Sequence, residues 1–302
     1  SGNDNSEGGM GKGGVQMMAF PTLFFDYDKD DQRRDVSVCN YGIVLSAKGN
    51  KYQMNTYNGM GVGKYRINWK KEMGATNTKR NINFPLLRYA DVLLMYAEAL
   101  NEVNNGPTQE AINAVKEVRK RAFRGNEAKA AAGIPTNHDD FLTFIQKERK
   151  LELSNEGLRR TDLTRWGKQY EMLMAEKQRL VNLAKRDGEF ANVPVYRAYY
   201  LSTTPKFEDP TIALSYIDLS QADVEALGLS ADQIKTLKIL NSSSKGSLKD
   251  VKLYEKDGKL YSAVNKPEGA VEHSYTILNM FSIVSIKQKG NLCVEDVLCL
   301  FL

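Results

Sequence analysis

Three glutamates near the middle of the chain have a spacing that could place paired carboxylates on one helical face. Glu148, Glu152 and Glu156 stand four residues apart, so on a helix they share one side. Carboxylates serve as general acid and base where their environments push the two pKa values apart. Arginines stand among these glutamates in the sequence, so the pattern favours ion pairing over acid–base catalysis.

A second carboxylate pair, Asp91 and Glu98, lies seven residues apart in a predicted helix. Asp91 can pair with Arg88 three residues earlier, and Glu98 can bond to a neighbouring helix. We therefore interpret both as structural. The chain has only two histidines, His138 and His273, both in loop-like contexts. A histidine-based triad or metal site is not indicated.

Other chemical motifs are weak. The three cysteines form neither an even framework nor a CxxC pair. A GxGxxG pattern at residues 9–14 has no strand before it, and the Gly63-Lys64 pair lacks the earlier glycine of a P-loop. We interpret both as turns. The sequence thus predicts no catalytic residue, no metal ion and no cofactor.

The composition is that of an ordinary globular chain, with 302 residues, 42% hydrophobic and 26% charged. No apolar run reaches the roughly 18 residues of a membrane-spanning helix, and residues 1–15 lack the charged and apolar regions of a signal peptide. The net charge is +5, and residues 147–186 hold eleven Lys or Arg against six Asp or Glu. Opposite charges there recur at i+3 and i+4, as in Glu156 and Arg160. We expect an ion-paired face and no nucleic-acid partner.

Apolar residues at helical spacing predict three helices between Asn83 and Lys168. Their buried faces are Leu86, Leu87, Ala90, Leu93, Leu94, Ala97 and Leu100, then Ala111, Ile112, Val115, Val118 and Ala122, then Phe141, Phe144, Ile145 and Leu151. A break at residues 104–107, with Thr108 as N-cap, predicts an antiparallel hairpin. From Arg88 to Ala122 the hairpin spans 35 residues, close to the roughly 34-residue period of the tetratricopeptide repeat. Such a unit needs stacked neighbours to bury its open hydrophobic face.

The flanking regions predict smaller elements. Alternation at residues 34–38 and 64–69 indicates short strands or extended segments. The helical pattern continues after Lys168 and ends near Lys185. Ser220 and Ser230 each open a short helix. Residues 251–264 predict a hairpin with its turn at 256–259. We expect the apolar end, residues 291–302, to pack loosely or not at all.

Three blocks in order resemble the SusD/RagB family, which are surface glycan-binding lipoproteins of Gram-negative bacteria. The blocks are Arg88-Tyr89-Ala90-Asp91 with Tyr96-Ala97-Glu98-Ala99, then Val118–Ala122, then Glu148-Arg149 through Arg165-Trp166-Gly167. Asp31 with Arg33-Arg34 fills the family's Asp-x-Arg element. The resemblance implies a mainly α fold of tetratricopeptide-like hairpins, irregular loops and a few short strands. It divides the chain into a Gly-rich lead-in (1–19), a SusD/RagB-like region (20–185, helical from 83) and a mixed loop and hairpin region (186–302).

The resemblance also implies a function. Family members capture an oligosaccharide or polysaccharide at the extracellular face of the outer membrane and deliver it to a SusC-type TonB-dependent transporter, without catalysis. They begin with a lipoprotein signal and an N-terminal helical half, so we expect this chain to represent the C-terminal portion, without the lipid anchor. Two alternatives stay open: a tetratricopeptide-like scaffold that binds protein, and a carbohydrate-active enzyme that uses Glu148 or Glu152.

Sugar capture needs flat aromatic faces for the C–H side of the ring and polar side chains for its hydroxyl groups. The segment before the helical signature supplies both, in the region where related proteins place part of their glycan site. The predicted ligand-binding residues are Tyr52, Tyr57, Tyr65, Arg66, Asn68 and Trp69. The alternative is that these aromatic side chains pack on the helices.

Overall fold

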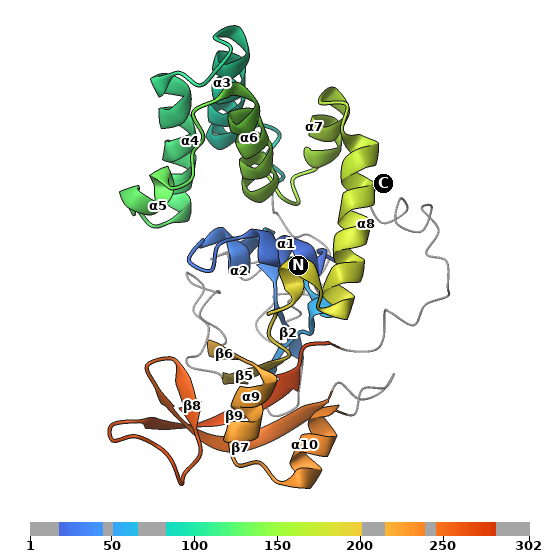
Figure 1. Ribbon diagram of the computed structural model, residues 1–302, viewed down its shortest axis with the longest axis vertical. Helices are drawn as coiled ribbons and strands as arrows, with labels where there is room; N and C mark the ends of the chain where they lie inside the picture. Colours follow the sequence, from blue (N-terminus) through green and yellow to red (C-terminus); the bar gives the residue numbers. More distant parts are fainter. Residues whose placement is uncertain (1–17, 45–50, 66–82, 201–214, 239–245, 282–302) are drawn as a thin grey trace, which may run out of the picture.

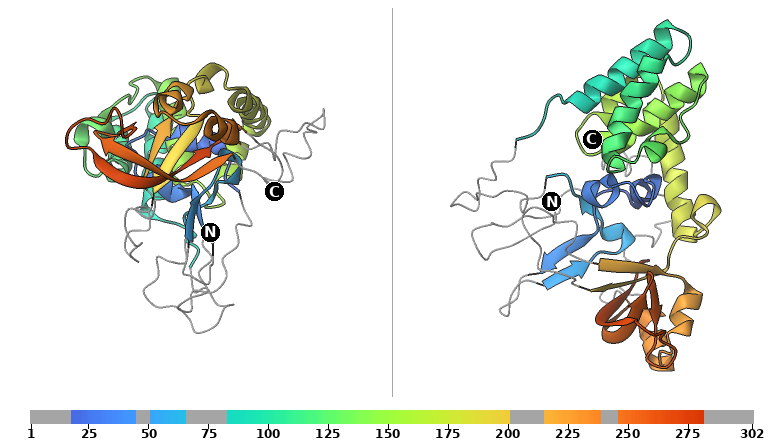
Figure 2. Two further views of the ribbon diagram at one scale, coloured as in Figure 1. Left: turned by 90° about the horizontal axis from the view of Figure 1, so that it is seen from below. Right: turned by 90° about the vertical axis from the view of Figure 1, so that its left-hand side faces the viewer.

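The computed structural model describes residues 18–44, 51–65, 83–200, 215–238 and 246–281 (Figure 1). A helical unit lies at one end of the molecule and a five-stranded sheet at the other, with a thin N-terminal layer between them (Figures 1 and 2). The long helix α8 (Gln169–Lys185) runs alongside and packs on α1 (Pro21–Asp26). None of the described helices is long and apolar enough to cross a membrane.

The predicted helical hairpin is confirmed as α3 (Tyr89–Val103) and α4 (Gln109–Ala122). The Thr108 side chain accepts a hydrogen bond from the Ala111 backbone N–H at 3.2 Å, as an N-cap does. The third helix is α6 (His138–Glu152), after the short α5 (Glu127–Ala131). One buried cluster joins α3, α4 and α6: Ala90, Leu94, Ala97, Ala111, Ala114, Val115, Val118, Phe141 and Ile145.

Helix α3 begins later than the apolar pattern predicted. Leu86 and Leu87 are 88% and 62% exposed, so their predicted burial is wrong. They precede Arg88, whose backbone is extended, and therefore never join the helical face. On α3 itself, a stripe of apolar side chains remains exposed: Tyr89, Val92, Met95, Tyr96 and Val103. A helix pair of this type leaves such a face open until a neighbour stacks on it.

The N-terminal layer contains α1, α2 (Arg33–Ser37), η1 (Tyr57–Gly59) and two strand pairs. The pairs are β1 (Val38–Cys39) with β4 (Gly61–Val62), and β2 (Tyr41–Val44) with β3 (Lys51–Met54). The strand predicted at residues 34–38 is wrong, because most of it is α2. The Asp31 carboxylate accepts from the Arg33 backbone N–H at 2.9 Å and holds the chain in a turn there. Residues 66–69 lie outside the described ranges.

The carboxy-terminal sheet has the order β6-β5-β9-β7-β8, all antiparallel. Its strands are β5 (Tyr196–Tyr200), β6 (Ser215–Leu219), β7 (Ser247–Lys256), β8 (Lys259–Tyr261) and β9 (Val271–Asn279). The hairpin predicted at 251–264 is confirmed, with Asp257 and Gly258 at φ 50° and 72° in its turn. Helices α9 (Gln221–Ala226) and α10 (Ala231–Lys238) are capped by Ser220 and Ser230, as predicted.

The apolar end at residues 291–302, which was predicted to pack loosely, lies outside the described residues. The sequence analysis did not predict β9. Strand β9 lies in the middle of the sheet, and Tyr275, Ile277 and Met280 are completely buried. Strands β5 and β6 also had no clear periodic signal. A strand of this kind is stabilised by partners distant in sequence, so local pattern alone does not reveal it.

A buried arginine of the sheet contacts the N-terminal layer. The Arg197 side chain on β5 is 0% exposed, and its Nε donates to Asp218 Oδ1 at 2.6 Å. Its guanidinium carbon lies 4.1 Å from the ring centroid of Tyr216 and also faces the rings of Phe24 and Tyr57. Aromatic faces stabilise a desolvated cation. The sheet therefore contacts the rest of the molecule through a specific polar and aromatic junction.

Candidate functional site

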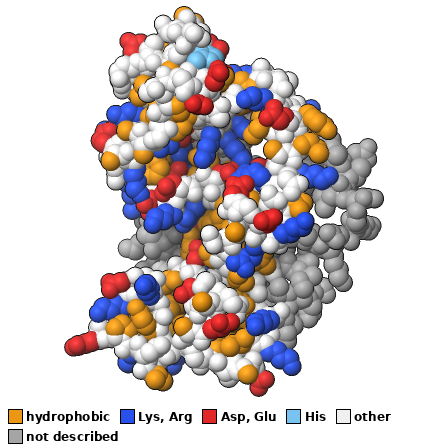
Figure 3. All heavy atoms as spheres, in the orientation of Figure 1, with side chains coloured by type: hydrophobic (Ala, Val, Ile, Leu, Met, Phe, Trp, Pro, Cys, Tyr) orange, Lys and Arg blue, Asp and Glu red, His pale blue; other side chains and the backbone are white. Residues whose placement is uncertain are grey.

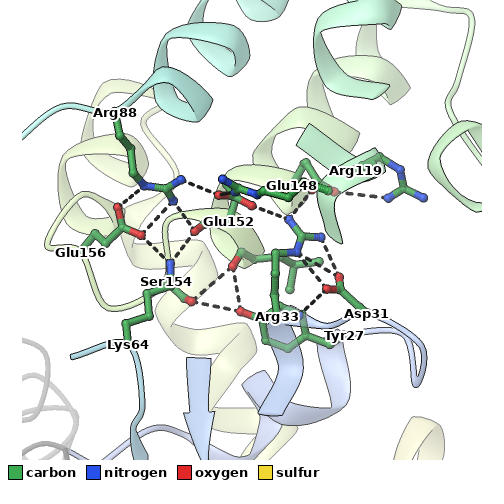
Figure 4. A network of polar contacts seen from close by, with 12 residues as sticks. Tyr27, Asp31, Arg33, Lys64, Arg88, Arg119, Glu148, Glu152, Ser154 and Glu156 are labelled. Carbon is green, nitrogen blue, oxygen red and sulfur yellow. Dashed lines mark hydrogen bonds and ion pairs between the residues drawn. The ribbon is translucent and has the colours of Figure 1, made fainter. Parts of the chain in front are cut away.

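The three glutamates singled out in the sequence lie in one network of ion pairs (Figure 4). Glu148 Oε1 and Glu152 Oε2 both accept from Arg33 Nη1, at 2.6 and 3.0 Å. Glu156, just after α6, accepts from Arg88 Nε at 2.6 Å, and Arg88 Nη1 reaches Glu152 at 2.5 Å. The side chains of these glutamates are no more than 5% exposed. The ion-paired interpretation of the row is confirmed.

Further partners come from other parts of the chain. Arg119 and Arg121 of α4 bind Glu148 and Glu152, and Lys64 Nζ binds the Glu152 backbone carbonyl at 2.5 Å. The same ammonium contacts Glu156. Burial lowers the pKa of Lys64 overall, although Glu156 acts in the opposite direction. The network thus joins α2, the turn after β4, both helices of the hairpin and α6.

The local pairs expected from the sequence differ from those in the structure. Arg149 of α6 binds Asp91 of α3 at 2.7 Å and Asp162 of α7 (Arg159–Arg165) at 2.8 and 3.0 Å. Asp91 therefore pairs with Arg149 and not with Arg88, which is held by Glu152 and Glu156. Glu98 does bond a neighbouring helix: it accepts from Arg165 and Trp166 at the end of α7. Figure 3 shows basic and acidic side chains interspersed over the helical part of the molecule.

The electrostatics of Glu152 oppose a role as general acid. Burial acts to raise the pKa of this carboxyl, but Arg33, Arg121 and Arg88 outweigh it and hold the pKa below its ordinary value. A general acid in a glycosidase needs a raised pKa. The residues on which the enzyme alternative was based therefore form a structural ion cluster.

A cleft of about 390 Å³ lies beside this network. That volume is within the range of small-ligand sites, about 300–1,000 Å³. Its lining includes Arg33, Lys64, Tyr65, Pro85, Arg88 and Arg121. The Arg121 side chain is 63% exposed, so its guanidinium group is accessible to a ligand in the cleft.

Tyr65, one of the predicted ligand-binding residues, lines this cleft. Its ring stacks on Phe84, with centroids 5.5 Å apart and planes inclined by 28°. Phe84 is 53% exposed. The Tyr65 hydroxyl is buried and has no hydrogen-bond partner among the described residues. Together the two rings form an aromatic wall next to charged groups.

The other predicted residues are placed differently. Tyr57 is 3% exposed, its ring packs against Phe25 and Phe281, and its hydroxyl donates to the Pro194 carbonyl at 3.0 Å. Its ring has no open face, so Tyr57 is a core residue and not a sugar contact in this structure. Tyr52 lies in β3, opposite Ile43. Arg66, Asn68 and Trp69 lie outside the described residues.

The sequence reasoning missed Arg121, which lines the cleft, and Phe84, which stacks on Tyr65 beside it. Phe84 was included in the helical stretch, and only its position before Pro85 signalled a non-helical segment. Arg121 belongs to the second family block, but the sequence reasoning assigned it no role in ligand binding. Among the described residues, no group of three or more His, Cys, Asp or Glu side chains is arranged to hold a metal ion.

The helical hairpins, short strands and cleft define a mainly α protein of tetratricopeptide-like architecture, as predicted. The model of the SusD family matches residues 11–226, well over half of the chain. The chain therefore belongs to the SusD family, which confirms the resemblance found in the three sequence blocks.

Relatives with this family name include two proteins of Formosa agariphila. SusD-like protein P2 is 32% identical over 157 residues, which cover 49% of this chain and 31% of the relative. SusD-like protein P38 is 38% identical over 93 residues, 30% of this chain and 18% of the relative. A crystal structure of a SusD homologue from Bacteroides thetaiotaomicron is 29% identical, with a TM-score of 0.48, and covers 63% of this chain and 38% of that one. The chain thus spans less than a third of the length of each of these two curated relatives.

Proposed function

We propose that this protein binds a glycan at the extracellular face of the outer membrane and passes it to a SusC-type TonB-dependent transporter. It binds the sugar without cleaving it and is held at the membrane through a lipid anchor. Membership of the SusD family is the observation that supports this proposal most strongly. The ion-paired state of Glu148 and Glu152 also favours binding over catalysis.

We place the sugar contacts at the cleft. The Tyr65 and Phe84 rings offer an aromatic surface for the C–H face of a pyranose. Arg121 and Lys64 stand beside it as donors to hydroxyl groups. The proposal extends to the nearby segment that includes Arg66, Asn68 and Trp69.

A second candidate is a protein-binding scaffold without glycan binding. It is favoured by the exposed apolar stripe of α3, since tetratricopeptide-like helices bind peptide segments or other helices along such faces. The charged, aromatic cleft has no role in this alternative.

The two candidates differ in a native affinity-gel experiment. We expect the 302-residue chain to be retarded in gels that contain at least one polysaccharide from a panel of plant, algal and host glycans, relative to a non-binding reference protein. Normal migration in every gel, together with capture of a helical protein partner, would support the scaffold. Co-purification with a transporter from outer-membrane extracts tests the delivery step.

A further inference from the structure

The two faces of the carboxy-terminal sheet differ sharply at its β7–β8 end. Helices α9 and α10 cover one face (Figures 1 and 2), and Leu253, Tyr275 and Ile277 are buried beneath them. Alternate residues on the same strands point to the other face. That face, which we call the outer sheet face, carries Lys252, Tyr254, Lys256, Lys259, Tyr261 and Glu272.

Two tyrosines form the centre of the outer sheet face. Tyr254 of β7 is the register partner of Tyr261 on β8. Directly opposed side chains on antiparallel strands lie about 5 Å apart at Cβ. Both tyrosines are only partly buried. The pair therefore forms an accessible aromatic surface on a rigid sheet.

Lysines surround this aromatic pair. Lys256 and Lys259 oppose each other at the turn end, and Lys252, with a side chain 75% exposed, lies two residues before Tyr254. Lys266, in the loop after β8, places its Nζ 4.0 Å from the Tyr254 ring centroid.

Glu272 of β9 places a carboxylate on the outer sheet face, and the exposed Asp257 and Glu268 stand in the adjoining turn and loop. Glu272 is 3.3 Å from Lys252 and also accepts from the Tyr254 hydroxyl. The strands thus carry more lysines than carboxylates on the outer sheet face, and its complement is an anionic ligand with a flat, partly apolar surface.

We infer that the outer sheet face binds an acidic polysaccharide, meaning pyranose rings that carry carboxylate or sulfate groups. Sugar rings lie on Tyr254 and Tyr261, and their anionic groups pair with Lys252, Lys259 and Lys266. This inference rests on the proposed function for its choice of a carbohydrate. The strands β7, β8 and β9 that form it lie beyond residues 11–226, which the family model matches.

Strands β7, β8 and β9, which carry the outer sheet face, lie at the opposite end of the molecule from α3, α4 and α6, which border the cleft (Figure 1). Tyr65 follows β4 in the N-terminal layer, whereas Tyr254 and Tyr261 belong to the carboxy-terminal sheet. A long polysaccharide that contacts both would be held more tightly than by either site, because the second contact is intramolecular. The two sites can be disabled separately.

Affinity gels with polygalacturonate, dextran sulfate and neutral dextran test the inference. We expect polygalacturonate or dextran sulfate to retard the chain and dextran to have no effect. The double variant Tyr254→Ala, Tyr261→Ala should weaken binding about tenfold or more, since it removes both aromatic contacts to the sugar rings. Lys259→Glu should weaken it also. Circular dichroism confirms that each variant retains its sheet.

The matched control is Lys235→Glu on α10, the helix that covers the opposite face. Binding that falls equally in Lys235→Glu and Lys259→Glu, or that survives loss of both tyrosines, would overturn the inference in favour of non-specific charge attraction. Tighter binding of oligodeoxythymidylate than of either acidic polymer would overturn it in favour of a nucleic-acid surface. Tyr170→Ala, which alters an exposed tyrosine on α8 outside both sites, should leave this retardation unchanged. Tyr65→Ala tests the cleft proposal, so failure of one proposal is distinguishable from failure of the other.

Discussion

Replacing Glu152 with glutamine should lower the free energy of unfolding by about 3 kcal/mol, because it removes a counter-charge of the largely buried Arg33 and the partly buried Arg88. The Glu152 side chain is 2% exposed and pairs with Arg33, Arg88 and Arg121. Arg33 and Arg88 keep other carboxylates, which places the effect at the low end of the range for a broken buried pair. Urea denaturation of the variant measures it.

The same variant should also change how stability depends on pH. The folded-state pKa of Glu152 lies below its ordinary value, which in unfolded chains is about 4.3. Its contribution is therefore complete above that pH and is lost as the pH falls through the lower, folded-state pKa. Glu152→Gln should show less acid destabilisation than the parent below about pH 4.

The matched control for this prediction is Glu127→Gln. Glu127 pairs with Lys120 on the surface, and its side chain is 59% exposed. Its replacement should leave the urea midpoint unchanged. If Glu152→Gln and Glu127→Gln have the same stability, the ion network does not hold the helical unit to the N-terminal layer.

Replacing Arg149 with methionine should destabilise the protein by about 3–5 kcal/mol, because the buried Asp91 loses its cation and Asp162 keeps only the partly exposed Arg165. Arg149, Asp91 and Asp162 have side chains no more than 6% exposed. Their three hydrogen bonds, at 2.7 to 3.0 Å, join α6 to α3 and α7. Thermal or urea denaturation measures the loss.

A rescue experiment distinguishes charge from packing. The triple variant Arg149→Met, Asp91→Asn, Asp162→Asn removes the stranded carboxylate charges and should be more stable than Arg149→Met alone. A triple variant that is equally unstable would mean that the shape of the arginine side chain matters and its charge does not.

Local sequence signals predicted the helical unit well. The spacing of Ala90, Leu94 and Ala97, and the capping residue Thr108, depend on neighbours within one or two turns. The turn at Asp257-Gly258 is equally local. These features follow from backbone geometry that a short stretch of sequence determines on its own.

Long-range partners were not predictable in this way. Glu152 meets Arg33 across 119 sequence positions and Arg88 across 64, so the carboxylate row was recognised as ion-paired without its true partners. Strand β9 was missed because its stability comes from β5 and β7. Leu86 and Leu87 fitted the helical period but precede the helix, since nothing in the period indicates where a helix begins.

The aromatic residues of the predicted site show the same limit. Tyr57 and Tyr65 occur in similar Gly-rich sequence, yet Tyr57 is buried against Phe25 and Phe281 and Tyr65 lines the cleft. Composition identified the region, and only the tertiary contacts separate the core ring from the one beside the cleft.

The central claim is that a glycan binds at the Tyr65–Phe84 wall. Its most direct test is calorimetric titration with the best glycan of the gel panel, in a Tyr254→Ala, Tyr261→Ala background that removes the outer sheet face. We expect Tyr65→Ala to weaken the Kd about tenfold. Tyr170→Ala, which alters a tyrosine 73% exposed on α8, should leave the Kd unchanged. Equal affinity in the two variants would contradict the claim.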